Sequence, residues 1–184
     1  MLSEDKRIKS KEQLREFLEL EYRRFPLYGR RYISYFLQLS EGAILRRHTK
    51  LLRYTEYHMN TGHKLRGAFY WARLMKLQNK HSMHVPINCC DKGLTIFHVS
   101  PIIINTNASI GKNCSISPFA AVVNSDIQDL APQLGDNINL GCGCKILGNI
   151  VLADGISVGA GAVVTKSFGE PGIHLAGVPA KKIN

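Results

Sequence analysis

The sequence lacks any long apolar stretch free of charge, and its first residues are themselves charged. A membrane-spanning helix needs about 20 mainly apolar residues, and a secretory signal needs an apolar core of its own. We therefore expect neither element and place the protein in the cytoplasm. The cysteines are five, an odd number, which also argues against the disulfide framework of a small secreted domain.

Patterns for binding metal ions and nucleic acids are missing as well. Cys142 and Cys144 form a C-x-C pair, but no nearby histidine and no second pair completes a ligand set. We therefore expect no metal ion. The chain carries a net charge of +10, yet its basic residues form no recognisable nucleic-acid-binding motif. We therefore expect no nucleic-acid partner.

The positive charge is confined to the first half of the chain. Residues 1–84 hold 18 Lys/Arg and 8 Asp/Glu, whereas residues 85–184 hold 6 of each. Glycine has the opposite bias, with 4 before residue 85 and 12 after it. This change predicts a domain boundary near His84. The basic half is either a solvated helical surface or one that attracts an anion, such as an acidic glycan, a lipid-linked substrate or a phosphate-bearing cofactor.

Apolar residues in this half recur at helical spacing. Ser10 and Gln13 are placed for a capping box at the start of the first helix. Breaks are predicted near Pro26–Gly29, Gly42 and Gly62, which gives three or four helices. The residues of the expected apolar faces are Leu14, Phe17, Leu18 and Tyr22; Tyr32, Phe36 and Leu39; and Leu65, Ala68, Phe69, Ala72 and Met75.

The second half has a period of six residues. Positions four beyond each aliphatic residue of the period are small or aliphatic too, and Cys114 and Cys144 occupy two of them as core filler. The aliphatic residues at this period are Ile104, Ile110, Ile116 and Val122, and then Leu134, Leu140, Ile146, Leu152, Val158 and Val164. The jump from Val122 to Leu134 is twelve residues, so the register survives the interruption.

Such a period fits neither an α-helix nor simple strand alternation, and it is typical of a parallel β-helix. Three hexapeptides make one triangular coil, with the aliphatic residue pointing inward and the small residue at a corner. Stacked coils bury a continuous core. The alternative is a β-sandwich with evenly spaced strands, which ten in-register positions make a poor fit.

Four segments carry a family resemblance: residues 84–111, GCGCKILGNI (141–150), VGAGAVVTKSF (158–168) and AGVPAKK (176–182). Together they resemble the hexapeptide-repeat acyltransferases. Within that family they are most similar to the serine O-acetyltransferases and their shorter relatives from capsule and surface-polysaccharide gene clusters. The resemblance implies a mainly β fold: a left-handed parallel β-helix (85–168) with a basic α-helical region (1–84) and a C-terminal cap (169–184). It also implies a homotrimer.

By this resemblance His98, in GLTIFH, is the general base that takes a proton from the acceptor hydroxyl, which then attacks the thioester of acetyl-CoA. An imidazole suits this step because its ordinary pKa, about 6.5, lies close to working pH. A packed, hydrogen-bonded histidine is the alternative interpretation. Six other histidines form no constellation in the sequence, and most are expected at the surface: His48, His58, His63, His81, His84 and His174.

The sequence departs from the family around this histidine. Phe97 stands where serine acetyltransferases carry an Asp, and the upstream Asp that orients the base falls at Met83. A second active-site histidine, which belongs to the amino-acid acceptor site, aligns with Ala131, and the helper histidine of capsule-type relatives aligns with Ser117. The resemblance thus predicts a base without its usual partners, and it favours a sugar acceptor over L-serine.

The remaining site residues follow from the same resemblance. Acetyl-CoA is expected to lie in a groove between neighbouring β-helices, where small residues let its pantetheine arm approach the backbone and a lysine meets its phosphates. The matching positions are Cys142, Ala160, Thr165, Lys166 and Lys181. The interruption, residues 123–133, is expected to project as a loop that contacts the acceptor. Its candidates are Asn124, Asp126 and Asp129.

The leading hypothesis is acetyl-CoA-dependent O-acetylation of a hydroxyl on a capsular or surface-polysaccharide sugar or its lipid-linked precursor, with peripheral membrane contact in the latter case. The first alternative is serine O-acetyltransferase of cysteine synthesis. The second is a non-catalytic solenoid that binds a partner through its basic helices.

Overall fold

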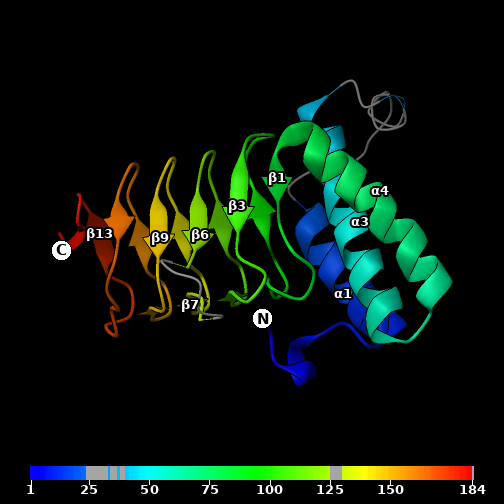
Figure 1. Ribbon diagram of the computed structural model, residues 1–184, viewed down its shortest axis with the longest axis horizontal. Coiled ribbons are helices and arrows are strands. Elements are labelled where there is room, and N and C mark those ends of the chain that lie inside the picture. Colours follow the sequence, from blue (N-terminus) through cyan, green and yellow to red (C-terminus); the bar gives the residue numbers. More distant parts are fainter. Residues whose placement is uncertain (24–32, 34–36, 38–39, 125–129, 184) are drawn as a thin grey trace.

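The computed structural model describes residues 1–23, 33, 37, 40–124 and 130–183. A group of helices from the first part of the chain lies against one end of a long prism of short strands, and the C-terminus lies at the far end (Figure 1). The described helical elements are η1 (Glu4–Lys6), α1 (Lys11–Tyr22), α3 (Glu41–Asn60) and α4 (Lys64–His81). None of the described helices is long and apolar enough to cross a bilayer.

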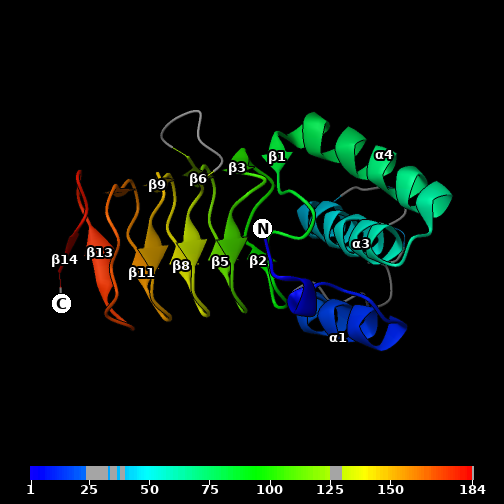
Figure 2. The same ribbon diagram turned by 60° about the horizontal axis from the view of Figure 1, so that its bottom comes forward.

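The strands are two or three residues long and form the three walls of the prism (Figure 2). In chain order they are β1 (Met83–His84), β2 (Thr95–Ile96), β3 (Ile102–Ile104), β4 (Ser109–Ile110), β5 (Ser115–Ile116), β6 (Ala121–Val123), β7 (Gln133–Leu134), β8 (Asn139–Leu140), β9 (Lys145–Leu147), β10 (Val151–Leu152), β11 (Ser157–Val158), β12 (Val163–Val164), β13 (His174–Ala176) and β14 (Lys181–Lys182).

Each turn of the chain visits the three sheets in the same order. A strand of the six-stranded sheet (β14-β13-β11-β8-β5-β2) is followed by one of the five-stranded sheet (β1-β3-β6-β9-β12) and then by one of the three-stranded sheet (β10-β7-β4). Neighbouring coils pair in parallel, and among the described strands only β13 and β14 pair antiparallel. The fold is the expected left-handed parallel β-helix. Parallel pairing between coils excludes the sandwich alternative.

The register explains how the count of six survives its interruption. Ile104 pairs with Val122, eighteen positions later, as expected for a coil of three hexapeptides. Val122 pairs with Ile146, which is twenty-four positions later, because the coil between them contains the interruption. The difference is one hexapeptide, so the inserted residues leave the stack in register on both sides.

The aliphatic residues of the six-residue period are buried, as the sequence predicts. All ten aliphatic residues of the period are at most 5% exposed. The small positions are buried too, including Cys114 and Cys144. Each fully buried aliphatic side chain contributes about 1.5–3 kcal/mol, so the repeat forms one continuous apolar core along the prism.

The helix boundaries confirm part of the sequence analysis. Ser10 and Gln13 form the predicted capping box of α1, and α3 and α4 are separated at Gly62, whose φ is +77°. A helix boundary lies near Gly42, as predicted, although not at the glycine itself. Helix α3 begins at Glu41 and runs through Gly42, because the Ser40 side chain caps it by accepting from the Ala43 N–H.

The predicted apolar face of α4 is wrong. Leu65 is 90% exposed and Phe69 is 55% exposed, whereas the buried side chains include Leu74 and Leu77. Helix α4 turns this other face inward because Gly67 lets α3 approach closely: a Cβ there would lie 2.6 Å from Met59 Sδ. The predicted face formed by Tyr32, Phe36 and Leu39, and the break at Pro26–Gly29, lie outside the described residues.

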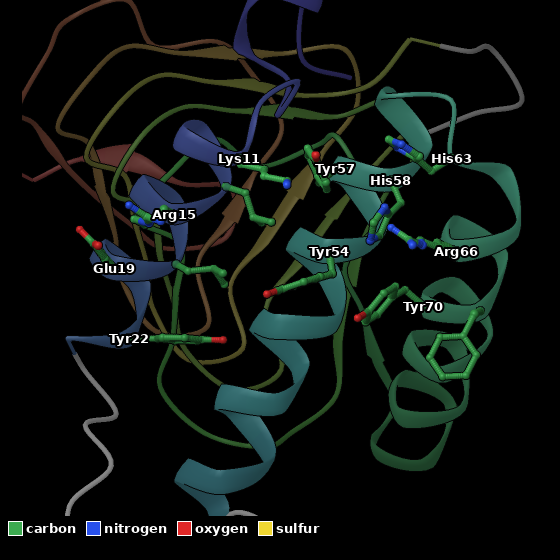
Figure 3. A pocket seen from close by; sticks show the side chains of 13 residues that line it. Lys11, Arg15, Glu19, Tyr22, Tyr54, Tyr57, His58, His63, Arg66 and Tyr70 are labelled. Atoms are coloured by element: carbon green, nitrogen blue, oxygen red, sulfur yellow. The ribbon is translucent and has the colours of Figure 1, made fainter.

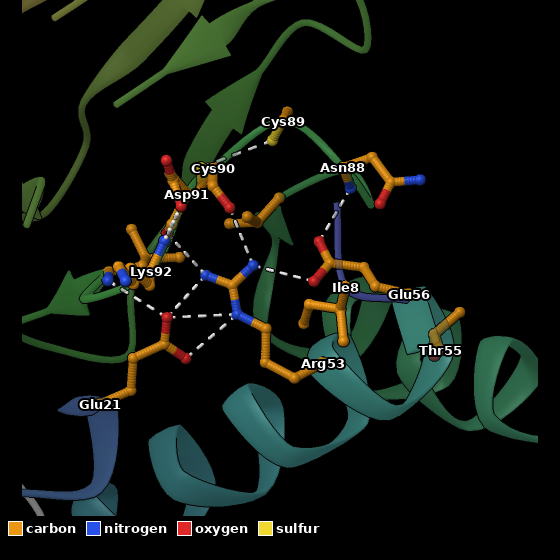
Figure 4. Close-up of polar contacts among 12 residues, drawn as sticks. Ile8, Glu21, Arg53, Thr55, Glu56, Asn88, Cys89, Cys90, Asp91 and Lys92 are labelled. Carbon is orange, nitrogen blue, oxygen red and sulfur yellow. Dashed lines mark hydrogen bonds and ion pairs between the residues drawn. The ribbon is translucent and has the colours of Figure 1, made fainter. Parts of the chain in front are cut away.

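A buried ion cluster joins the helices to the first coil (Figure 4). Arg53 of α3 pairs with Glu21 of α1 at 2.6 Å and with Glu56 at 2.8 Å, and all three side chains are buried. The same guanidinium donates to the backbone carbonyls of Cys90 and Asp91, at 2.8 and 3.0 Å. Its donors thus bind two helices and the start of the solenoid at once.

A second buried polar contact also joins the helices to the start of the solenoid. The ring of His48, on α3, lies 3.1 Å from the Gln78 side chain of α4, which donates to the carbonyl of Val85. Burial, and secondarily the charge of Arg53, lowers the pKa of His48 to about 4. The imidazole is therefore neutral in the folded protein at neutral pH.

We predict that Arg53→Met destabilises the protein by about 3–5 kcal/mol, because it leaves two buried carboxylates without their cation. Urea denaturation measures the change. The control Arg73→Met alters an exposed arginine of α4 and should cost less than about 0.5 kcal/mol. A loss below about 1 kcal/mol for Arg53→Met would show that the cluster does not hold the helices in place.

We predict that stability falls as the pH drops from about 6.5 to about 4. In that window the unfolded chain binds a proton at His48 and the folded chain does not, so the free energy of unfolding decreases by about 3 kcal/mol. In His48→Gln the pH dependence of urea denaturation should be shallower by this amount. His84→Gln, at an exposed position, serves as control and should retain the wild-type slope.

Candidate active site

One edge of the prism carries His98 and two of the expected cofactor positions. It is the row of corners where the chain passes from the six-stranded to the five-stranded sheet, and we call it the His98 edge. His98 follows β2 by two residues, and the same offset after the paired strands β5, β8 and β11 gives Pro118, Cys142 and Ala160. The sheet register therefore stacks these corners in one line.

His98 is held by a carboxylate from the helices. Its Nδ1 lies 3.1 Å from Glu41 Oε2, and the other oxygen of Glu41 accepts the backbone N–H of Val99 at 2.7 Å. The imidazole remains 62% exposed. Glu41 is the first residue of α3, so the start of that helix is docked on the corner that carries the histidine.

The pairing keeps Glu41 ionised. Burial would raise the pKa of this carboxyl, but the hydrogen bonds from Val99 and His98 outweigh it and lower the pKa below its ordinary value. With Nδ1–H donated to a carboxylate, the lone pair of the ring is left on Nε2. The site thus holds an exposed imidazole whose second nitrogen is free to accept a proton.

The sequence analysis predicts only that the usual partners of His98 are missing, and it did not find Glu41 as an acidic partner. Glu41 lies fifty-seven positions before His98, and no spacing rule joins a helix start to a distant β-helix corner. Phe97 and Met83 replace the family's acids, as read from the sequence, and Met83 is fully buried. The only sequence signal for Glu41 was its place directly after the helix-capping Ser40.

Two further positions where the resemblance expects a histidine hold Ser117 and Ala131. Ser117 follows β5 and donates its backbone N–H to the carbonyl of Leu140, one coil away from Phe97. Ala131 is buried beside the end of the interruption. Neither residue supplies an imidazole to the site.

The expected cofactor positions Cys142 and Ala160 are both exposed on the His98 edge. Coils stack about 4.8 Å apart, so these corners lie two and three coils from His98, about 10 and 14 Å. Among the described residues, their backbone N–H groups donate to no other group. A Cβ added to the adjacent Gly143 or Gly161 would meet nothing within 4 Å. The edge is therefore open and offers hydrogen-bond donors.

The other expected cofactor residues lie farther along or around the prism. Lys181, in β14, pairs with Ala176 near the C-terminal end of the His98 edge and is exposed, while Lys182 pairs with Glu170 at 2.6 Å. Thr165 and Lys166 follow β12 and lie at the next edge, between the five- and three-stranded sheets.

Asn124 follows β6 at this next edge and accepts from the side chain of Asn105 at 2.9 Å. Within one chain it does not lie beside His98. Asp126 and Asp129 lie outside the described residues. We call the edge of Asn124, Thr165 and Lys166 the Asn124 edge.

Histidine placement differs from the sequence expectation in the helices. His48 and His58 are buried, at 1% and 7% exposure, rather than at the surface. His58 and His63 lie among aromatic residues of α3 and α4 (Figure 3), an arrangement without a sequence signal. In the part of the chain that the structure describes, no three His, Cys, Asp or Glu side chains gather as metal ligands.

Known proteins were compared with the chain, and no protein-family model matches it. It is 33% identical over 103 residues to a serine acetyltransferase of Buchnera aphidicola, covering 53% of this chain and 38% of that protein. It is 28% identical over 145 residues to the serine acetyltransferase of Escherichia coli K12, covering 72% of this chain and 52% of that protein. The chain thus spans about half or less of these relatives' length.

Solved structures share the fold. A serine acetyltransferase of Brucella abortus superposes with a TM-score of 0.62 at 23% identity, covering 94% of this chain and 68% of that one. A serine acetyltransferase of Neisseria gonorrhoeae gives 0.65 at 22% identity, covering 94% and 66%. The Brucella abortus enzyme in complex with coenzyme A gives 0.65 at 24% identity, covering 94% and 66%. The chain therefore resembles serine O-acetyltransferases in sequence and in fold.

Proposed function

We propose that this protein is an acetyl-CoA-dependent O-acetyltransferase with His98 as its general base. One observation carries the proposal: an exposed imidazole, paired with Glu41, lies on the same prism edge as the open corners of Cys142 and Ala160. The resemblance to serine acetyltransferases, one of them solved with coenzyme A, supports it.

In the proposed reaction His98 accepts the acceptor's hydroxyl proton at Nε2 as the oxygen attacks the thioester carbonyl. The C–S bond then breaks, and the imidazolium returns the proton to the departing thiolate. Glu41 stabilises the positive charge that the ring carries between these two proton transfers. The acetyl group passes directly to the acceptor, without an acyl-enzyme.

The His98 edge suits acetyl-CoA in three ways. Its small corner residues, Cys142 and Ala160, leave the backbone accessible, and their N–H groups are available for the amides of the pantetheine arm. Lys181 lies toward the C-terminal end, where it would meet phosphate oxygens as a point charge. Acetyl-CoA supplies the activated acetyl group, and a cytoplasmic location follows from its use.

A homotrimer is part of the proposal. Asn124, Thr165 and Lys166 lie on a different edge from His98, so one chain does not bring all candidate residues together. If the Asn124 edge of one copy lies beside the His98 edge of the next, each cofactor groove is completed by two subunits. Such a closed ring needs one repeated interface, as threefold symmetry provides.

Two kinds of acceptor are candidates for the proposed reaction. The comparisons favour L-serine, because the relatives reported above are serine acetyltransferases. The sequence resemblance favours a sugar hydroxyl, because Ala131 stands at the position of the histidine of the amino-acid acceptor site. The sugar would belong to a capsular or surface polysaccharide or its lipid-linked precursor.

We predict that purified protein releases free CoA from acetyl-CoA only when a hydroxyl acceptor is added. L-Serine and a panel of surface-polysaccharide oligosaccharides are compared by thiol detection, and the larger kcat/KM identifies the acceptor. His98→Ala should lower the rate by at least about a hundredfold, because general base catalysis contributes about 10²–10⁴-fold.

The exposed His174→Ala is the matched control and should keep the wild-type rate. Unchanged turnover in His98→Ala would refute the base assignment. Absence of acetyl-CoA binding by calorimetry would refute the enzyme proposal as a whole and support the scaffold alternative.

We predict that Glu41→Gln lowers kcat about tenfold, because the imidazolium loses a charge interaction of about 1.4 kcal/mol. The amide still accepts the Val99 N–H, so folding and acetyl-CoA affinity should not change. Glu41→Asp should restore part of the rate.

The exposed Glu12→Gln of α1 removes the same charge from a different helix and should leave kcat unchanged. If Glu41→Gln alters only the melting temperature, the carboxylate has a structural role alone.

A further inference from the structure

A cavity of about 820 Å³ lies among α1, α3 and α4, remote from the His98 edge (Figure 3). Helix α3 links the two places. Glu41, its first residue, contacts His98, whereas Tyr54 and His58, which line the cavity, lie 13 and 17 residues later. At 1.5 Å per residue these positions are about 20–25 Å along the helix axis from Glu41. The proposed acetyl transfer uses none of the cavity's residues.

Aromatic rings form much of the cavity wall. Tyr54 and Tyr70 approach each other with centroids 5.1 Å apart, and Tyr70 stacks on His58 at 5.3 Å. Tyr57 flanks His58 at 5.0 Å. These rings come from two helices and meet in one place, so they present a preformed surface of aromatic faces and edges together with phenolic hydroxyls.

Positive charge lines the rim. Lys11 and Arg15 of α1 and Arg66 of α4 contribute three fixed cations, against a single carboxylate from Glu19. All four side chains are exposed, and in the described part of the chain none of the three cations takes part in an ion pair. The cavity therefore attracts an anion that no described residue supplies.

His58 contributes a largely buried imidazole to the wall of the cavity. His58 is 93% buried, and its Nδ1 has no hydrogen-bond partner among the described residues. Burial, with smaller effects of His63 and Arg66, lowers the pKa of His58 and keeps the ring neutral. This atom has less than 1 Å² of accessible surface and is out of reach of a ligand, so His58 would contact a ligand through the rest of its ring.

We propose that this cavity binds an acidic saccharide, namely a sugar ring that carries a carboxylate. The aromatic rings suit the apolar face of a pyranose, the neutral imidazole and the phenols suit its hydroxyls, and Lys11, Arg15 and Arg66 suit the carboxylate. The pocket size matches a small ligand, since such sites commonly enclose about 300–1,000 Å³. This site goes beyond the proposed acetyl transfer and does not depend on it.

The test is a binding titration without acetyl-CoA. A glucuronic-acid-containing tetrasaccharide is titrated into the full chain by calorimetry, alongside a neutral glucose tetrasaccharide and UDP. We expect the acidic tetrasaccharide to bind at least tenfold more tightly than the neutral one and more tightly than UDP. Raising the salt concentration should weaken it, because the cations are exposed.

The variant Lys11→Gln/Arg66→Gln should weaken this binding at least tenfold, and both side chains are exposed, so folding should be kept. The matched control Arg47→Gln/Lys76→Gln removes the same charge from a separate cavity of about 380 Å³ on the helices and should keep the affinity. His58→Phe keeps the stacking on Tyr70 and should weaken binding. The ratio of wild-type to variant affinity should change little with salt concentration.

Several results would overturn the proposal: no binding of the acidic tetrasaccharide, equal binding of the neutral one, tighter binding of UDP, or equal losses in the two double variants. These outcomes are independent of whether His98 supports acetyl transfer, so failure of one proposal is distinguishable from failure of the other.

Discussion

The buried cation of Arg53 is the contact on which the arrangement of the whole molecule depends. It bonds Glu21, Glu56 and the carbonyls of Cys90 and Asp91, and so fixes α1 and α3 to the first coil. Glu41 lies twelve residues earlier on α3, about 18 Å along a rigid helix, so the cluster also sets where Glu41 reaches the solenoid. One desolvated guanidinium, satisfied by four partner residues from three segments, thus positions the carboxylate that holds His98.

The regular register of the β-helix fixes the spacing of the other site residues. Its strands pair in strict register, so residues with the same offset after successive strands form a straight row. His98, Cys142 and Ala160 share one such row at steps of about 4.8 Å. Asn124 and Lys166 share the next one. The division of candidate residues between two edges is the physical basis for expecting a groove shared between copies of the chain.

Sequence reasoning succeeded where one local rule applied at every repeat. The period of six located ten inward aliphatics, and Cys114 and Cys144 were correctly placed in the core. It failed where contacts join distant segments. The face of α4 depends on Gly67 admitting Met59, and the burial of His58 depends on Tyr57 and Tyr70 closing around it. No spacing within a helix encodes such neighbours.

By itself the sequence determined the solenoid, its register across the interruption, the helical region and the candidacy of His98, because each follows from residues adjacent in the chain or repeated at a fixed period. Only the tertiary structure decided that His98 has an acidic partner, that Cys142 and Ala160 lie on its edge, and that the basic helices enclose an aromatic cavity. The physical reason is that α3 contacts residues of the solenoid far from it in sequence, through Arg53 with the first coil and Glu41 with His98 among others. Rigid-body docking of this kind is fixed by packing rather than by pattern.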